Sequence, residues 1–267
     1  MYPNEITEIF IYPVKSLRGI SLKTSYAGIR GLRYDRRWMI VDQNGHFLSQ
    51  RKFPQMTTFD VTLLDQGFEI NHSDDKILVP FNISTQDRIP VCIWKSNLIV
   101  CRADKEINQW FSDHLNFSCC LVYMDDSVNR SVSSKYQVNN ENVSFADGFP
   151  YLIIGEASLL DLNSRLKIKL PMNRFRPNFV FSSGAAFEED CFGIFEVGQA
   201  KFKAVKPCAR CIITTTDQST GVRGHEPLST LSEYRKKDNN VLFGQNLICL
   251  QEGAVQLGDK IILHEEK

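Results

Sequence analysis

The first hundred residues contain a series of short apolar runs that are separated by turn-forming residues. In chain order the runs are IFIYPV, RRWMIV, FDVTLL, FEI, ILVPF and VCIW. Their Ile, Val and Phe content is typical of strands. The DQNG that follows RRWMIV predicts a hairpin around Asn44 and Gly45. Many short strands at this spacing predict a β-barrel or a β-sandwich.

The second half of the chain mixes strand and helix patterns. Apolar residues recur at helical spacing over 104–115 and 156–170. A third, shorter helix is predicted over 226–237, with Pro227 near its start. The polar stretch 125–150 predicts an irregular surface loop. Further strands are predicted within NFVFSSG, FEVGQAKFKAV, CIITTTD and NLICLQEGAVQLGDKIILHEE. The predicted fold class is therefore α+β, mainly β.

Composition excludes several classes of protein. The 267 residues carry a formal net charge of zero, so binding to polyanions over the whole surface is not indicated. Aromatic residues are not interleaved with the basic ones, and we predict no nucleic-acid partner. No apolar run approaches the ~20 residues that a membrane span needs. The first residues lack the pattern of a secretory signal. We therefore expect a cytoplasmic protein without a membrane partner.

Two of the eight cysteines differ from the others. Five lie in or beside apolar runs, where a free cysteine behaves as a small hydrophobe; these are Cys92, Cys101, Cys119, Cys120 and Cys249. Cys191 is flanked by acidic and aromatic residues, which indicate little. Cys208 and Cys211 instead lie in KPCARCIITTTDQSTG, close to Lys206 and Arg210.

Four interpretations of this pair are open. A structural zinc site needs four ligands, and the sequence offers no second C-x-x-C and only scattered histidines. A dithiol switch favours a helix after the first cysteine, whereas CIITTTD favours a strand. Plain core packing leaves the neighbouring cations unexplained. A lone thiolate, stabilised by Arg210 and Lys206, could act as a nucleophile, a sulfur carrier or a ligand to a soft metal.

Basic residues are dense near the N-terminus. The stretch YPVKSLRG places Lys15, Ser16 and Arg18 directly after a predicted strand, and IRGLRYDRRW adds four arginines, Arg30, Arg33, Arg36 and Arg37. The stretch NRFRPN places Arg174 and Arg176 before another strand. Such runs are usually solvated and salt-bridged surface. The alternative is a phosphate clamp, because arginine offers two parallel donors to phosphate oxygens.

Five of these motifs occur together in a characteristic order. YPVKSLRG, DRRWMIV, NRFRPN, PCARCIITTTDQSTG and LFGQN resemble the MOSC family, which is named after the molybdenum cofactor sulfurase C-terminal domain. The similarity is greatest to the branch of the mitochondrial amidoxime-reducing component and its bacterial relatives, over about residues 5–264. The resemblance implies a MOSC β-barrel with flanking helices over 122–267. It also implies an N-terminal β-rich region over 1–121, whose first 36 or so residues contribute to a cofactor site.

The resemblance also implies a molybdenum cofactor, in which the metal is bound to molybdopterin. Cys211 would be the metal ligand and the catalytic residue, and Cys208 only a neighbour. Lys15, Ser16, Arg36 and Arg176 would contact the cofactor, most naturally at its phosphate. The remaining implied contacts are Ala146, Asp147, Gly148, Ala209, Arg210 and Asn246.

The implied activity is reduction of a small N-hydroxylated substrate. Some bacterial relatives continue into a ferredoxin-like domain, but this sequence has no C-x4-C-x2-C pattern. Electrons would therefore come from a separate donor protein with an iron–sulfur, flavin or haem group. The alternatives are a sulfur carrier or transferase that uses Cys211, or a carrier of the molybdenum cofactor.

Overall fold

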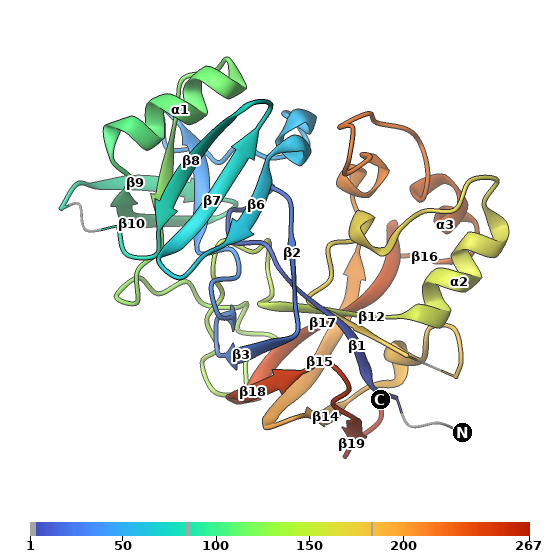
Figure 1. The fold of residues 1–267 in the computed structure, drawn as a ribbon. Helices are drawn as coiled ribbons and strands as arrows, with labels where there is room; N and C mark the ends of the chain where they lie inside the picture. Colours follow the sequence, from blue (N-terminus) through green and yellow to red (C-terminus); the bar gives the residue numbers. More distant parts are fainter. Residues whose placement is uncertain (1–3, 84–85, 183) are drawn as a thin grey trace.

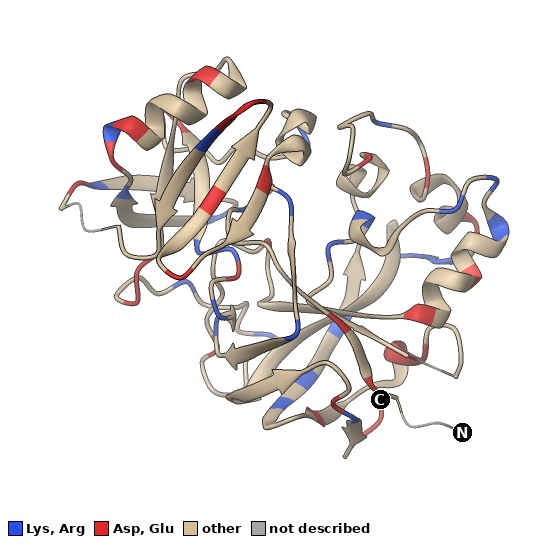
Figure 2. Cartoon of the chain, in the orientation of Figure 1, with Lys and Arg blue, Asp and Glu red and all other residues tan. Residues whose placement is uncertain are grey.

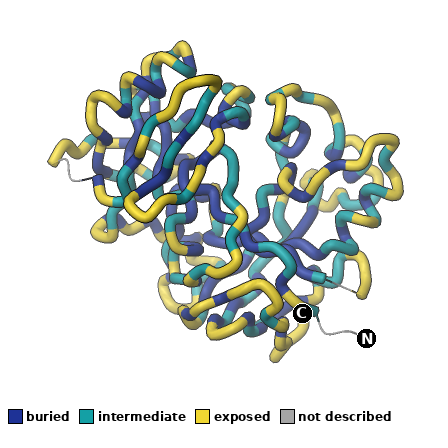
Figure 3. Tube along the Cα trace, viewed as in Figure 1, coloured by how far each residue is buried: buried dark blue, intermediate teal, exposed yellow. Residues whose placement is uncertain are grey.

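The structure is a computed structural model that describes residues 4–83, 86–182 and 184–267. It is an α+β fold built mainly from strands, as the sequence predicts (Figure 1). None of the helices in these residues is long and apolar enough to cross a membrane. The inward-facing residues of the strands are buried, whereas many of the connecting loops are exposed (Figure 3).

The largest sheet lies in the half of the molecule that contains the C-terminus (Figure 1). Its strands follow one another in the order β19 (Ile261–Leu263), β14 (Ile194–Val197), β15 (Ala200–Ala209), β17 (Asn240–Gln251), β12 (Tyr151–Gly155), β13 (Phe179–Phe181), β1 (Ile6–Ile11) and β2 (Ile20–Leu22), and β16 (Lys236–Lys237) pairs with β17. Neighbours are antiparallel except β12 and β13. Fully buried Phe179, Phe195 and Phe202 pack on one face, and α2 (Glu156–Arg165) and α3 (Leu228–Tyr234) flank the sheet.

The N-terminal half forms smaller sheets around its own core. One sheet has the order β5 (Trp38–Asp42), β11 (Cys119–Tyr123), β10 (Ser96–Arg102) and β9 (Arg88–Ile93), and another consists of β6 (Asp60–Leu63), β7 (Gly67–His72) and β8 (Asp75–Pro80). Helix α1 (Lys105–Leu115) packs on them, and its Phe111 joins Trp38 and Phe68 in one buried cluster.

The two halves share strands. Although β1 and β2 come first in the chain, they lie in the sheet that the later strands form. A fourth sheet joins β18 (Gly253–Gln256) near the C-terminus to β3 (Thr24–Gly28) and β4 (Gly31–Leu32). These pairings fix the residues just after β1 beside the large sheet. The domain boundary between residues 121 and 122 stays a prediction.

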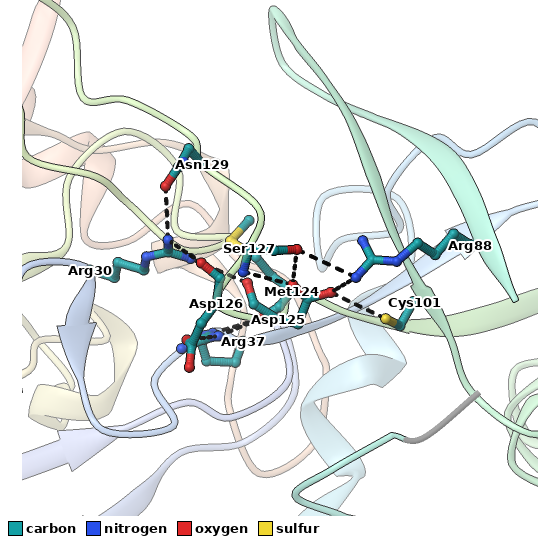
Figure 4. Close-up of polar contacts among 9 residues, drawn as sticks. All are labelled: Arg30, Arg37, Arg88, Cys101, Met124, Asp125, Asp126, Ser127 and Asn129. Carbon is teal, nitrogen blue, oxygen red and sulfur yellow. Dashed lines mark hydrogen bonds and ion pairs between the residues drawn. The ribbon is translucent and has the colours of Figure 1, made fainter. Parts of the chain in front are cut away.

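The chain leaves β11 through a segment that polar contacts hold in place (Figure 4). Arg30 donates to the carbonyl oxygens of Asp125 and Asp126 at 3.3 and 3.0 Å. The Arg37 Nε donates to the carbonyl oxygen of Met124 at 2.8 Å. The carboxylate of Asp125 forms an ion pair with Arg88. Burial favours a higher pKa for Asp125, but hydrogen bonds from Ser127 outweigh burial and lower that pKa to about 2. The N-terminal arginines thereby fix the connection to the second half.

The hairpin and helices that the sequence predicts are present, with small changes in length. The amide of Gly45 donates to the carbonyl oxygen of Asp42 at 3.0 Å, and Gly45 has a positive φ of 77°. A Cβ there would lie 2.4 Å from the carbonyl oxygen of Pro90, so glycine is required. Helix α2 ends at Arg165, before the predicted end at Leu170.

Two predictions of local structure are wrong. The segment after Cys211 is not a strand but the 3-10 helix η4 (Ile212–Thr215), with Cys211 at its N-cap. The loop 125–150 is irregular but does not lie only on the surface, since Phe145 is fully buried within it. Its Arg130 is also buried and donates to the carbonyl oxygens of Ser144 and Ala146 at 2.7 and 2.5 Å.

A buried carboxyl group beneath α2 predicts an unusual pH dependence of stability. Glu189 is fully buried, accepts one bond from the Ser158 hydroxyl at 2.8 Å, and leaves Oε1 without a partner. Burial raises its pKa from 4.5 to about 7. Because the folded pKa is the higher one, the stabilisation is complete below pH 4.5 and is lost as the pH rises through 7.

We therefore expect the free energy of unfolding to fall by about 3 kcal/mol between pH 4.5 and 8 through this group alone. Urea unfolding at several pH values should show a smaller fall in Glu189→Gln than in the wild type. Glu233→Gln is the matched control, because Glu233 is exposed on α3. Equal pH profiles for wild type and Glu189→Gln would contradict the assignment.

Candidate functional site

One pocket of about 280 Å³ brings together all eleven residues that the sequence singles out as cofactor contacts. These residues are Lys15, Ser16, Arg36, Ala146, Asp147, Gly148, Arg176, Ala209, Arg210, Cys211 and Asn246. They come from six separated segments of the chain. Their convergence is a property of the fold, whereas their role as contacts to a bound group stays a prediction.

The segments reach the pocket at the ends of strands. Lys15 and Ser16 follow β1, and Arg36 precedes β5. The loop 146–148 leads into β12, and Arg176 lies just before β13. Ala209 ends β15 and residues 210–211 follow it. This strand pairs with β17 so that Lys206 lies opposite Asn246. Side chains at strand ends are held by the sheet and still reach the space beside it.

Three of these residues have unusual backbone conformations. Ser16, Arg36 and Arg176 have positive φ values of 73°, 51° and 55°. Residues with a Cβ rarely adopt this region, and each such position costs of the order of 1–3 kcal/mol. Strained positions of this kind cluster at ligand sites, where the surrounding structure must enforce them. Three in one pocket therefore support a binding role.

Lys15 and Asp147 form a partly buried ion pair on the pocket wall. The Lys15 Nζ also donates to the carbonyl oxygen of Phe145 at 2.8 Å. Burial lowers the pKa of Lys15 to about 8, against the opposing effect of Asp147. Desolvation favours a raised pKa for Asp147, but Lys15 and Arg51 outweigh it and hold that pKa well below its ordinary value. Asp147 is therefore an anion at neutral pH.

The sulfur atom of Cys211 has a cationic partner that the sequence did not reveal. The Arg51 Nη2 lies 3.4 Å from the Cys211 Sγ and 3.0 Å from the Asp147 Oδ2. Arg210, which the sequence suggested for this role, instead places its Nη1 3.0 Å from the Cys208 Sγ. Arg210 therefore contacts the first cysteine, and its predicted role as a cofactor contact beside Cys211 stays a prediction.

Arg51 is framed by an exposed aromatic residue of the N-terminal half. Its guanidinium lies 4.9 Å from the ring centre of Trp94, and the Trp94 Nε1 donates to the Asp147 Oδ1 at 3.3 Å. Trp94 occupies the turn between β9 and β10 with a positive φ of 55° and is 47% exposed. The turn between β9 and β10 therefore contacts two residues that line the pocket, Arg51 and Asp147.

The pocket is strongly cationic although the whole chain is neutral. Six cationic side chains line it against one carboxylate, that of Asp147. The cations are Lys15, Arg36, Arg51, Arg176, Lys206 and Arg210. Over the chain as a whole, basic and acidic residues are both spread over many elements (Figure 2). This local excess of positive charge suits an anionic ligand.

Two family descriptions together match nearly the whole chain. Residues 140–262 match the MOSC domain, and residues 4–118 match the MOSC N-terminal beta barrel domain. The chain therefore belongs to the MOSC family. The match agrees with the motifs recognised in the sequence and with the mainly β fold.

Two amidoxime-reducing components are similar to this chain along most of their length, and a molybdenum cofactor sulfurase along about a third of its length. Mitochondrial amidoxime reducing component 2 of Rattus norvegicus is 31% identical over 277 residues, which cover 96% of this chain and 82% of that protein. Mitochondrial amidoxime-reducing component 1 of Homo sapiens is 30% identical, covering 97% and 82%. Molybdenum cofactor sulfurase of Oryza sativa subsp. japonica is 33% identical over 90% of this chain and 32% of that protein.

Proposed function

We propose that this protein binds the molybdenum cofactor and reduces small N-hydroxylated compounds with electrons from a separate donor protein. The observation that carries the proposal is the Cys211 thiol in a pocket lined by six cationic side chains. A soft sulfur ligand suits molybdenum, and the cations suit the phosphate of a pterin cofactor. The similarity to two amidoxime-reducing components supports the choice of reaction.

The residues present fit such a group. Arg51 Nη1 and Arg210 Nε are buried donors without a hydrogen-bond partner among the described residues, and both residues line the pocket. A buried donor without a partner costs about 1–3 kcal/mol, which a bound anion would recover. Gly148 offers open space, since no atom lies within 4 Å of the position that a Cβ would take. Cys211 supplies the one thiol ligand that the cofactor's own sulfur atoms would complement.

Each segment of the pocket has a separate task in this proposal. Lys15, Ser16, Arg36 and Arg176 would hold the phosphate, and the loop 146–148 would hold the pterin. Arg130 keeps that loop in place through three bonds to its carbonyl oxygens. Arg51 would orient the Cys211 sulfur, since its Nη2 lies 3.4 Å from the Sγ. The bound cofactor would take the oxygen atom from the substrate and provide the two electrons of the reduction.

Elemental analysis combined with a reduction assay tests the proposal. We expect about one molybdenum per purified chain and reduction of a benzamidoxime-type substrate when an artificial reductant is present. Absence of turnover in protein that retains molybdenum and receives electrons would overturn the assignment as a reductase.

A second candidate function is a carrier of cofactor or sulfur. It is favoured by the similarity to the molybdenum cofactor sulfurase and by the second thiol, Cys208, in the same pocket. Retained molybdenum without turnover would support a cofactor carrier. A persulfide trapped on Cys211 and identified by mass spectrometry would support sulfur transfer.

A further inference from the structure

The ring of Tyr12 lies next to two guanidinium groups of the pocket. The Arg36 Cζ is 4.4 Å from the ring centre, and the Arg176 Cζ is 4.1 Å from it. Both arginines line the pocket, whereas Tyr12 is only 2% exposed and lies behind them. One buried aromatic ring thus contacts two cations that come from distant parts of the chain.

Tyr12 is anchored beside each of these arginines. Its hydroxyl donates to the carbonyl oxygen of Pro177 at 3.0 Å, next to Arg176. Its backbone amide donates to the Asp35 Oδ1 at 2.8 Å, next to Arg36. The ring also fills the space beside Gly19, where a Cβ would lie 2.5 Å from the Tyr12 Cε1. These contacts leave the ring little freedom to move.

The arrangement holds two like charges close together. Burial lowers the pKa of Arg176 to about 10, and the charge of Arg36 contributes to that change. Asp35 compensates one charge, since its Oδ2 accepts from the Arg36 Nη1 at 2.6 Å. Among the described residues, the Arg176 side chain donates to the neutral oxygens of Leu17 and Gln218, at 2.8 and 3.4 Å. Asp35 and Asp147 therefore act on Arg176 through their charge and not through a hydrogen bond among these contacts.

The face of an aromatic ring favours cations, by about 2 kcal/mol when they are desolvated. A ring shared by two guanidinium groups therefore offsets part of their mutual repulsion and fixes their relative position. Arg36 and Arg176 both have positive φ values, of 51° and 55°, so their backbone positions must also be enforced by their surroundings.

We propose that Tyr12 is a positioning residue that holds Arg36 and Arg176 as one binding unit for a phosphate dianion. The inference rests on the proposed function in so far as the dianion is the phosphate of the cofactor. Tyr12 itself does not touch the ligand. Its ring, rather than its hydroxyl, carries the role, because the ring makes both guanidinium contacts.

Phosphate binding by the full chain tests this inference independently of reduction. The dissociation constant for inorganic phosphate is measured by calorimetry on protein from which the cofactor has been stripped. We expect Tyr12→Leu to bind phosphate about tenfold more weakly than wild type. Tyr12→Phe should bind within about twofold, because it keeps the ring. Tyr26→Leu is the control, since Tyr26 is 48% exposed and does not line the pocket.

Wild-type affinity in folded Tyr12→Leu would overturn the inference, and so would a Tyr12→Phe variant as weak as Tyr12→Leu. If Tyr12→Leu does not fold, a cycle of Arg36→Gln, Arg176→Gln and the double variant decides. If the two arginines act as one unit, each single substitution should weaken phosphate binding nearly as much as the double substitution does. Additive losses of binding free energy in the double variant would show that the two arginines do not act as one unit. Tyr12-dependent phosphate binding in a protein without reductase activity would leave the inference intact and reject the proposed function.

Discussion

Replacing Cys211 with alanine should abolish both the molybdenum content and the reduction of a benzamidoxime-type substrate, whereas Cys208→Ala should preserve both. Cys211 provides the one thiol that Arg51 contacts, at 3.4 Å, on the wall of the cationic pocket. Without the Cys211 sulfur, the pocket keeps its cations but loses the thiol that would bind the metal. We expect activity to fall by more than ~100-fold, since even the loss of a residue that only supports a metal ligand typically costs about 10- to 100-fold.

Cys208 has a different surrounding. Its sulfur accepts from the Arg210 Nη1 at 3.0 Å, but Arg210 is also fixed by the carbonyl oxygen of Phe175 at 2.6 Å. Loss of the thiol should therefore leave Arg210 in place. We expect Cys208→Ala to retain activity within about threefold, since removing one small side chain usually has little effect where the neighbouring residue is held by another contact.

The comparison of the two variants also separates the remaining interpretations of the C-x-x-C. All eight cysteines carry free thiols in the structure. Equal loss of activity in both variants would indicate that the two thiols act as a pair, and it would contradict the assignment of Cys211 as the lone ligand. Unfolding temperatures of both variants provide the control for a general loss of stability.

The location of the site could be predicted from the sequence because the motifs themselves contain its residues. Lys15 and Ser16 follow a recognisable strand, and Arg176 precedes another. The convergence of these segments could not be derived from spacing, since it depends on β1 pairing with β13 far along the chain. Resemblance to a family provided that long-range information.

Arg51 was missed for a related reason. It follows the hairpin around Gly45 in a segment, LSQRKFP, that carries no pattern typical of a binding site. Its contact with Cys211 joins residues that are 160 positions apart. A local signal for such a contact does not exist, because it arises from the packing of the N-terminal half against the loop after β15.

The prediction of a strand after Cys211 is wrong because side-chain hydroxyls there bond to the backbone carbonyl groups that a strand would pair with its neighbour. The Thr214 hydroxyl donates to the carbonyl oxygen of Cys211 at 3.0 Å, and the Thr215 hydroxyl donates to that of Ile212 at 2.8 Å. Such local bonds satisfy backbone groups that a strand would pair with a neighbour. Strand propensity of threonine therefore did not decide the structure, and Cys211 lies at the end of a strand.

Arg51→Gln should reduce the activity by roughly 10- to 100-fold while the chain stays folded. Arg51 is the cationic partner of the Cys211 sulfur and also pairs with Asp147 at 3.0 Å. Charge-assisted hydrogen bonds contribute about 1.5–3 kcal/mol each, and about 1.4 kcal/mol corresponds to a factor of ten. Glutamine preserves much of the length of the side chain but removes the charge. Steady-state assays of the cofactor-loaded enzyme measure the loss.

Lys52→Gln provides a matched control, because it removes a neighbouring cation that is exposed and does not line the pocket. It should keep activity within about twofold, as exposed positions usually do. Molybdenum content of Arg51→Gln separates two causes: reduced content indicates weaker retention of the cofactor, and full content with low activity indicates an effect on the reaction itself. Wild-type activity and wild-type molybdenum content in Arg51→Gln would show that the Arg51–Cys211 contact has no functional role.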